Sequence, residues 1–333
     1  MNIAAGPPTQ RAFFSKHPSL TNLILVFLSL ILRLTVGEFI LRRFMPVYTA
    51  NIPAAFEYDP ESGYRFRTEI HLFRTTDFQQ ETRINHLGTS NFQETFEGYS
   101  TLVFSVGDSY TVGDGLPADM AYPFQLDLIL NRDPQGFYTK KFGIANLGVG
   151  GYGGEQSLIA LRRATSRIGR PAIVIYLGSE NDYQDDVEFQ NGSRHQHIFA
   201  GSPYWGRLIS PIQWLATDVQ IVVRLKILIH NMRIAPVSER VANESSPVAE
   251  LEQPIFEKLL AYCKQSNSSL IVSWSDVGPS YDFLKTRASK NGVGFADWRP
   301  RMNSIQATIP ALPLKNQHSG GHYRGWVNRV IAE

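Results

Sequence analysis

The chain has 333 residues, of which 43% are hydrophobic, so it can build a sizeable core and is not globally disordered. Its formal net charge of +2 is too close to balance to make nucleic acid or an acidic polymer an obligatory partner. The single cysteine, Cys263, excludes an intrachain disulfide and a metal site built from several cysteines.

An apolar stretch lies near the N-terminus, after a polar tail of residues 1–19. Residues Leu20 to Ile40 span about 30 Å as a helix, the thickness of a hydrocarbon core. Arg33 and Glu38 interrupt its second half, each at a cost on the order of 3 kcal/mol at mid-bilayer. A signal peptide is the alternative, but the length and the lack of an A-x-A site favour an uncleaved anchor over 20–42. Positive charges flank both ends, so charge alone does not set the orientation in the bilayer.

Residues 43–98 are rich in aromatic and polar side chains. The alternation over Thr82 to Asn85 and the Leu87-Gly88 turn favour short β segments over helix. We expect a β-rich lead-in that packs on the main domain.

From residue 99 to 333, strand and helix patterns alternate. This alternation predicts an α/β protein, a three-layer α/β/α sandwich with a parallel flavodoxin-like sheet covered by helices on both faces. The expected strands are Thr101–Val106, Phe142–Asn146, Ala172–Leu177, Ser269–Trp274 and Val293–Asp297, and the expected helices are Tyr122–Asn131, Glu155–Ile168, Gln253–Gln265, Tyr281–Lys290 and a final one after His322.

The alternation is interrupted by a lid-like insertion and linker over residues 191–250. An apolar helical stretch within Asn191 to Pro236 has too few consecutive apolar residues to cross a membrane. We interpret it as a helix covering the active face, followed by an exposed linker rich in Ser, Glu and Pro.

Candidate chemistry gathers where the strands end. Gly107-Asp108-Ser109 follows the first buried strand, at the place where α/β proteins carry reactive groups, and makes Ser109 a candidate nucleophile. An ordinary polar turn is the alternative for these three residues alone. A glycine-rich loop from Gly148 to Gly154 follows the second strand, and a polar loop from Gly178 to Asp186 follows the third.

Ester hydrolysis needs an activated oxygen nucleophile, a base in hydrogen-bond reach and donors for the developing oxyanion. The chain offers two histidines, His318 and His322, just before its last amphipathic helix. Together with Ser109, a glycine-turn amide and an asparagine, one of them would complete that set.

The order of these blocks resembles the SGNH/GDSL hydrolase superfamily, as a membrane-anchored member, over about residues 56–333. VFSVGDSYTVGDG matches the first block and implies Ser109 as nucleophile. NLGVGGYG implies that the amide of Gly151 joins that of Ser109 in the oxyanion hole. GSEND, one residue longer than the usual third block, implies Asn181 as the side-chain donor.

The last block departs from the family pattern. The spacing to the final helix selects His322 as base, with His318 as alternate, but the family's preceding Asp falls on Ser319 or Gly320. Three interpretations stay open: a Ser-His dyad oriented by a backbone carbonyl, an acid from elsewhere such as Asp182 or Asp297, or a weakened or non-catalytic relative.

Other polar residues have simpler roles. Asp108 is expected to be a hydrogen-bond partner within its turn. The loop carboxylates Asp185 and Asp186 are expected to be solvated, with a substrate rim as the alternative. His195 and His197 lack supporting metal ligands, so no metal and no cofactor is expected. Aromatic side chains could stack on a sugar or simply pack under a lid, namely Tyr183, Trp205 and Tyr323.

The resemblance implies an ester hydrolase or acyl-transfer enzyme acting on an acylated small molecule or an O-acylated cell-envelope or extracellular polysaccharide. It also implies a single-pass cell-membrane protein whose catalytic domain is periplasmic or extracellular. The competing hypothesis is a catalytically weak or inactive envelope protein that binds glycan or acts as a scaffold. The sequence does not set the oligomeric state.

Overall fold

The computed structural model describes residues 17–44, 55–75, 79–192, 219–222, 224–225, 246–316 and 321–333. The chain divides into two compact units. One comprises Met1–Val47 and Trp214–Asn231, and the other Tyr48–Gln213 and Met232–Glu333.

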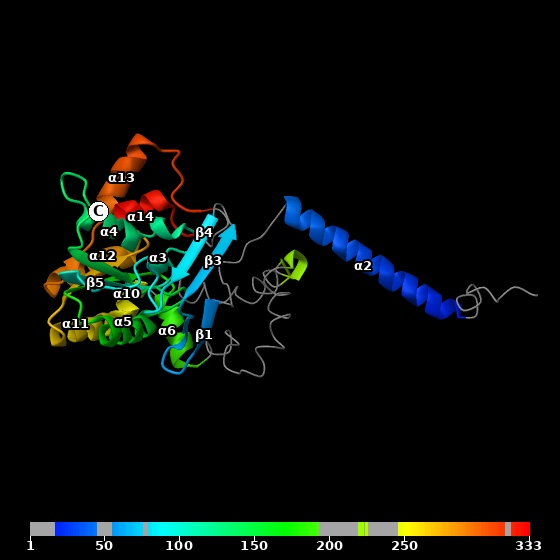
Figure 1. Ribbon diagram of the computed structural model, residues 1–333, viewed down its shortest axis with the longest axis horizontal. Coiled ribbons are helices and arrows are strands. Elements are labelled where there is room, and N and C mark those ends of the chain that lie inside the picture. Colours follow the sequence, from blue (N-terminus) through cyan, green and yellow to red (C-terminus); the bar gives the residue numbers. More distant parts are fainter. Residues whose placement is uncertain are drawn as a thin grey trace, which may run out of the picture. The chain divides into compact units, whose positions relative to one another are not determined.

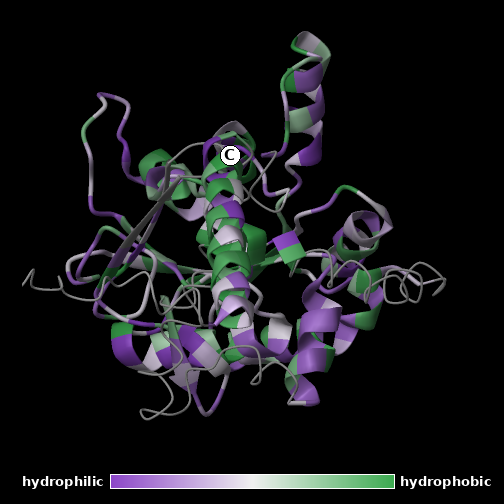
Figure 2. Ribbon diagram, turned by 90° about the vertical axis from the view of Figure 1, so that its right-hand side faces the viewer, coloured by the Kyte–Doolittle hydropathy of each residue, from purple (hydrophilic) through white to green (hydrophobic). Residues whose placement is uncertain are grey.

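The first unit contains the long helix α2, Pro18–Phe44. Its most apolar 18-residue window has a mean hydropathy of 2.2, so α2 is long and apolar enough to cross a membrane. Figure 2 shows hydrophobic turns along this helix with polar residues among them. The predicted anchor, residues 20–42, lies inside α2, and its orientation stays a prediction.

Glu38, the acidic residue within the apolar stretch, has hydrogen-bond partners in the same unit. Its carboxylate pairs with Arg42 Nε at 2.6 Å and accepts the backbone N–H groups of Gln220 and Ile221 at 2.8 and 3.0 Å. These contacts offset part of the cost of a carboxylate in an apolar segment. They also join residues 219–222 to α2. That a helix of the insertion covers the active face stays a prediction.

The second unit is built on a parallel sheet of five strands in the order β6-β5-β7-β8-β9. In chain order this is 2-1-3-4-5, the flavodoxin-like arrangement, so the predicted fold class is confirmed. The interior position of β5, the second of the five strands, agrees with its composition, because its side chains from Val103 to Val106 are all buried. The strands are β5 Thr101–Gly107, β6 Phe142–Asn146, β7 Ile173–Gly178, β8 Ser269–Trp274 and β9 Gly294–Phe295.

Two successive residues of β7 show the two covered faces of the sheet. Tyr176 belongs to a core cluster with side chains of α5 (Gly154–Ile168) and α11 (Gln253–Gln265). Its neighbour Leu177 belongs to a cluster with α4 (Tyr122–Asn131) and α14 (Gly325–Ala332). Figure 1 shows these two helix pairs on opposite sides of the sheet. The three layers therefore follow from the period-two alternation of the strands.

The expected helices lie at the expected positions, but the sequence did not predict helices α6 and α13. The predicted polar loop Gly178–Asp186 is wrong in its second half, because helix α6 covers Asp182–Gln190. Acidic residues in the first helical turn, Asp182 and Asp185, interact favourably with the helix dipole, which apolar periodicity does not reveal. The remaining helices are α3 Ser109–Val112, the 3₁₀ turn η2 Ala118–Met120, α10 Val248–Leu251, α12 Pro279–Lys290 and α13 Arg299–Thr308.

The lead-in forms two antiparallel hairpins, β1–β2 (Phe56–Asp59 and Gly63–Phe66) and β3–β4 (Ile70–Thr75 and Gln79–Ile84). The first hairpin packs against α5. Gln156 Nε2 donates to the Ser62 carbonyl at 2.7 Å, and Arg163 pairs with Asp59 at 2.7 Å. The lead-in is thus tied to a helix of the main sandwich.

Candidate active site

Ser109 lies at the point where the strand order reverses. It is the first residue of α3, directly after β5, whose two neighbours β6 and β7 are reached by connections in opposite directions. Such a switch point opens a crevice at the carboxyl ends of the strands. The turn into α3 needs glycine at position 107, since φ is +149° and an added Cβ would meet the Leu177 carbonyl oxygen at 2.5 Å.

The structure brings Ser109 and His322 into contact. Ser109 Oγ lies 2.8 Å from His322 Nε2, although the two residues are 213 positions apart in the chain. This is the distance at which a histidine can take the proton of a serine hydroxyl. The other candidate base, His318, lies outside the described residues, as do His195, His197 and Trp205.

The backbone around His322 fixes its place beside Ser109. The His322 carbonyl accepts the N–H of Asn316 at 2.8 Å, and the Asn316 side chain donates to the Gly115 carbonyl at 3.2 Å. Gly115 follows α3 by a few residues. The histidine loop is therefore joined directly to the loop that leaves the nucleophile.

Asp108 is a fully buried carboxylate next to Ser109 and caps helix α3. It accepts the N–H of Tyr110 at 2.9 Å and the Ser179 hydroxyl at 2.8 Å. Burial raises the pKa of Asp108, while these hydrogen bonds and the charge of His322 act in the opposite direction. The turn-partner role expected from sequence agrees with these contacts, but Asp108 is also close enough to His322 to interact with its charge.

Gly151 lies in the loop between β6 and α5, which approaches Ser109. An added Cβ on the preceding Gly150 would lie 4.0 Å from the Ser109 Cβ. Gly151 has a φ of +76°, and its N–H forms no hydrogen bond within the described part of the chain. That amide is a suitable donor for a substrate oxygen.

Asn181 is held by carboxylates on both sides. Its Nδ2 donates to Asp185 at 2.7 Å and reaches Asp108 at 3.4 Å, and its Oδ1 lies 2.8 Å from the Ser179 hydroxyl. The longer contact turns the amide toward the residue beside the nucleophile. Asp185 is buried rather than solvated, which corrects the expectation for that carboxylate, because α6 folds it back under Asn181.

Two alternate acids have other partners. Asp182 accepts the Tyr176 hydroxyl at 2.5 Å, and its other oxygen lies 2.7 Å from the Ser179 hydroxyl oxygen. Burial and the nearby Asp108 raise the pKa of Asp182 well above its usual value. Asp297 accepts the Tyr281 hydroxyl at 2.6 Å and pairs with Lys285. Within the described residues, the hydrogen bonds of both acids are therefore made to groups other than His322.

Asp186 and Tyr183 are further residues that the sequence singled out. Asp186 is buried, not solvated, and accepts the N–H groups of Gly154 and Glu155 at 3.1 and 3.0 Å, so it caps α5. Tyr183 packs against the main core cluster. Both side chains therefore already have contacts within the protein.

Sequence reasoning missed two residues near the site. The Ser179 hydroxyl links Asp108, Asn181 and Asp182. Asp276 follows the end of β8, and its negative charge, after burial, contributes to the raised pKa of Tyr110. The Tyr110 ring centroid lies 5.1 Å from that of His322. Both positions lie within two residues of the end of a buried strand, a signal that could have identified them.

Within the described residues, no group of three or more His, Cys, Asp or Glu side chains is arranged to hold a metal ion. The chemistry available at the site is that of a hydroxyl nucleophile, an imidazole and amide donors.

No family model and no curated protein sequence matches the chain. Among solved structures, it is similar to a member of the lipolytic protein G-D-S-L family from Veillonella parvula, with 10% identity, a TM-score of 0.40 and coverage of 70% of this chain and 94% of the other. It is also similar to an acetyl xylan esterase, with 11% identity, a TM-score of 0.40 and coverage of 69% and 96%. The family name of the first is the one that the sequence motifs resemble, and we base the function on the site itself.

Proposed function

We propose that the protein is a serine ester hydrolase or acyl-transfer enzyme. The observation that carries this proposal is the 2.8 Å contact between Ser109 Oγ and His322 Nε2 at the switch point of the sheet. The open amide of Gly151 supports it, because its loop approaches Ser109 and it can donate to a substrate oxygen.

The proposed reaction has two steps, acylation of Ser109 and release of the acyl group, and His322 acts in both. Ser109 Oγ attacks the acyl carbon while His322 Nε2 takes the hydroxyl proton, and the carbonyl electron pair moves onto oxygen. The amides of Ser109 and Gly151 and the side chain of Asn181 stabilise that oxyanion. Collapse expels the alcohol, which takes the proton from His322. Water or a sugar hydroxyl then attacks the acyl-serine, with His322 again accepting and returning a proton.

The proposed substrate is an O-acylated polysaccharide of the cell envelope or extracellular space. This class comes from the family resemblance. It agrees with α2 serving as a single-pass anchor in the lipid bilayer, which would hold the catalytic unit at the outer face of the cell membrane.

The competing hypothesis is an inactive module that binds glycan or acts as a scaffold. The absence of the expected acid before His322 favoured it. The close approach of His322 to Ser109 favours the enzyme, since a module without catalysis has no need of this contact. We therefore retain the scaffold only as an outcome of the test.

The test is hydrolysis of a short-chain aryl acetate by the full chain in detergent micelles. We expect Ser109→Ala and His322→Ala each to lower kcat by at least about 10³-fold. The matched controls are exposed residues of the same types, Ser304→Ala and His86→Ala, and should retain the wild-type rate. Hydrolysis that persists in Ser109→Ala would contradict the nucleophile, and no hydrolysis by the wild-type protein on any aryl ester would favour the inactive module.

A further inference from the structure

A buried hydroxyl beside the candidate active site has more close oxygen neighbours than its single hydrogen can serve. Ser179 is fully buried and directly follows β7. Its Oγ lies 2.8 Å from Asp108 Oδ2, 2.8 Å from Asn181 Oδ1 and 2.7 Å from Asp182 Oδ1. A serine hydroxyl brings one hydrogen and can accept others at its lone pairs. Because contacts this short need a hydrogen between the two oxygens, at least one of the three neighbours must itself donate.

Two of the three neighbours are poor sources of that hydrogen. The Asn181 atom in contact is a carbonyl oxygen, which cannot donate. Asp108 is held as an acceptor, since its Oδ1 accepts the N–H of Tyr110 at 2.9 Å. Burial raises the pKa of Asp108, but this hydrogen bond and the charge of His322 oppose that effect and favour the ionised form.

The remaining neighbour, Asp182, is buried without a cation. Its Oδ2 accepts the Tyr176 hydroxyl at 2.5 Å, so Oδ1, which faces Ser179, is the oxygen free to carry a proton. Asp182 forms no ion pair within the part of the chain that the structure describes. Burial and then the negative charge of Asp108 raise the pKa of Asp182 well above its usual value, and the nearby Glu252 acts in the same direction.

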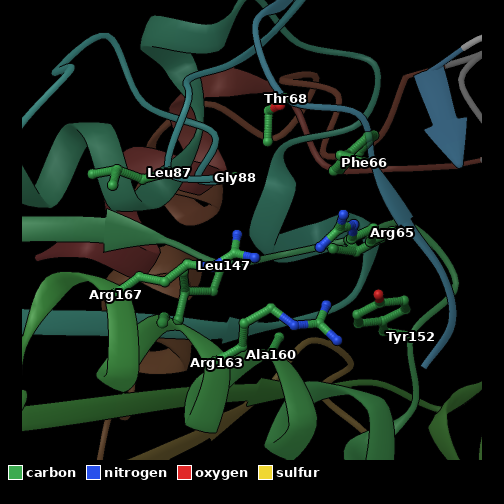
Figure 3. Close-up of a pocket in the computed structure, with 12 residues that line it drawn as sticks. Arg65, Phe66, Thr68, Leu87, Gly88, Leu147, Tyr152, Ala160, Arg163 and Arg167 are labelled. Carbon is green, nitrogen blue, oxygen red and sulfur yellow. The ribbon is translucent and has the colours of Figure 1, made fainter. Parts of the chain in front are cut away.

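A second buried aspartate of the same unit shows an arrangement that keeps such a group ionised. Asp59 pairs with Arg163 at 2.7 Å and accepts the N–H of Ser62 at 3.0 Å. Figure 3 shows the Arg163 side chain extending from α5 toward Tyr152. Although burial acts to raise the pKa of Asp59, the hydrogen bonds from Ser62 and Arg163 lower it. None of the described cationic side chains takes the corresponding place beside Asp182.

We propose that Asp182 is a positioning residue that carries a proton at neutral pH and donates it to the oxygen of Ser179, which in turn donates to Asp108. The negative charge of the group then stays on Asp108, the carboxylate whose charge acts on His322. This hydrogen-bond chain takes over part of the role of the acid missing before His322, because it holds a negative charge ready for the imidazolium that the reaction forms. The catalytic consequence rests on the proposed function, whereas the proton on Asp182 does not.

Infrared spectroscopy tests the proton directly, on the full chain in detergent micelles at pH 7. A protonated carboxyl has a C=O stretching band that is separate from the absorption of an ionised carboxylate. We expect Asp182→Asn to remove one such band from the wild-type spectrum. Tyr176→Phe should shift the band to higher frequency, because it removes the hydroxyl that is hydrogen-bonded to the other oxygen of Asp182. Asp119→Asn, at an exposed aspartate of η2, is the control and should leave the protonated-carboxyl region unchanged.

Two spectra would overturn the proposal. In one, Asp182→Asn removes ionised-carboxylate absorption and leaves every protonated-carboxyl band in place. In the other, Tyr176→Phe leaves all protonated-carboxyl bands unshifted. The second measurement decides the question if Asp182→Asn does not fold.

Steady-state hydrolysis of an aryl acetate tests the positioning role. Asparagine can donate to Ser179 and accept from Tyr176, so Asp182→Asn should keep at least about half of the wild-type kcat. Asp182→Leu has a similar size but no donor, and should lower kcat about tenfold. Ser179→Ala should cause a similar loss. The double variant Ser179→Ala/Asp182→Leu should lose no more, because Asp182 acts through Ser179.

The pH profile of kcat separates this role from a merely structural one. Asp182→Asn should leave the profile in place, since a neutral group replaces a neutral group. If Asp182 were ionised, the substitution would remove a negative charge beside Asp108 and move the acidic limb to lower pH, which would overturn the proposal. Equal losses of kcat in Asp182→Asn and Asp182→Leu would overturn it as well. The expected infrared bands in a protein without esterase activity would retain the proton on Asp182 and reject the proposed function.

Discussion

The hydroxyl of Tyr64 donates to the carbonyl of Gly150 at 3.0 Å, one residue before the candidate oxyanion donor Gly151. The carbonyl of Tyr64 in turn accepts the hydroxyl of Tyr152. The first lead-in hairpin therefore holds the loop on both sides of Gly151. The lead-in, which the sequence predicts only as a β-rich segment, therefore supports the candidate site.

Tyr64→Phe removes one hydrogen bond from this support and keeps the buried ring. We expect kcat for an aryl acetate to fall about three- to tenfold with KM nearly unchanged, since one hydrogen bond is worth about 1 kcal/mol. Tyr58→Phe, an exposed tyrosine of the neighbouring strand β1, is the matched control. Equal kcat values for the two variants in steady-state assays would show that the hairpin does not support the loop.

Asp108→Asn tests the buried charge beside the nucleophile. Asparagine can still cap α3 through the N–H of Tyr110, but it removes the negative charge that attracts protonated His322. Because the reaction places a positive charge on His322, we expect kcat to fall about tenfold, the effect of ~1.4 kcal/mol.

The pH dependence of kcat tests whether Asp108 acts through its negative charge. The Asp108 carboxylate helps only above its pKa, which burial raises from the usual value, so the ratio of wild-type to variant kcat should fall as the pH is lowered through that pKa. Asp127→Asn, at another largely buried carboxylate with a raised pKa, is the control and should show no such change. A ratio that does not depend on pH would mean that Asp108 acts only as a cap.

The sheet and its main helices could be predicted because their signals are local. Strand β6 and helices α4 and α11 have the predicted bounds, since a short buried run before a glycine-rich loop and the helical spacing of apolar residues mark them directly. Helices α6 and α13 were missed, because DYQDDVEFQ and RPRMNSIQAT are too polar to show an apolar face.

The candidate site likewise contains residues that the sequence predicts and contacts that it does not predict. Ser109, Gly151 and Asn181 follow strand ends, so topology places them at one edge of the sheet. Contacts between distant segments, such as Tyr64 with Gly150, carry no sequence pattern because they depend on how the hairpin packs. The role of Ser179 depends likewise on the burial of three polar neighbours around one hydroxyl.

Gly107→Ala tests the need for glycine at the turn into α3. An added Cβ would lie 2.4 Å from Thr111 Oγ1 and 2.5 Å from the Leu177 carbonyl oxygen, at a φ of +149°. Gly98→Ala is the control, since its φ is also positive, at +84°, but nothing lies within 4 Å of an added Cβ. We expect Gly98→Ala to cost about 1 kcal/mol of unfolding free energy and Gly107→Ala 1–3 kcal/mol more. Equal midpoints in urea would contradict the steric explanation.

Glu252 is buried beside Asp186, whose carboxylate accepts the N–H groups of Gly154 and Glu155 at the start of α5. Burial and then the negative charge of Asp186 raise the pKa of Glu252 to about 9. The folded protein therefore holds a proton on Glu252 that the unfolded chain loses above its usual pKa of 4.5. By linkage, this group lowers stability progressively as pH rises from about 4.5 to about 9.

Glu252→Gln removes that proton uptake and keeps the shape of the side chain. We expect the variant to be more stable than the wild type at pH 8, by about 2–4 °C in Tm. The difference should shrink as the pH falls, since both side chains are then neutral in both states. Glu250→Gln, an exposed glutamate in α10, is the control and should give no pH-dependent difference. A Glu252→Gln protein that is less stable than the wild type at pH 8 would show that the carboxylate is ionised and stabilising in the folded chain.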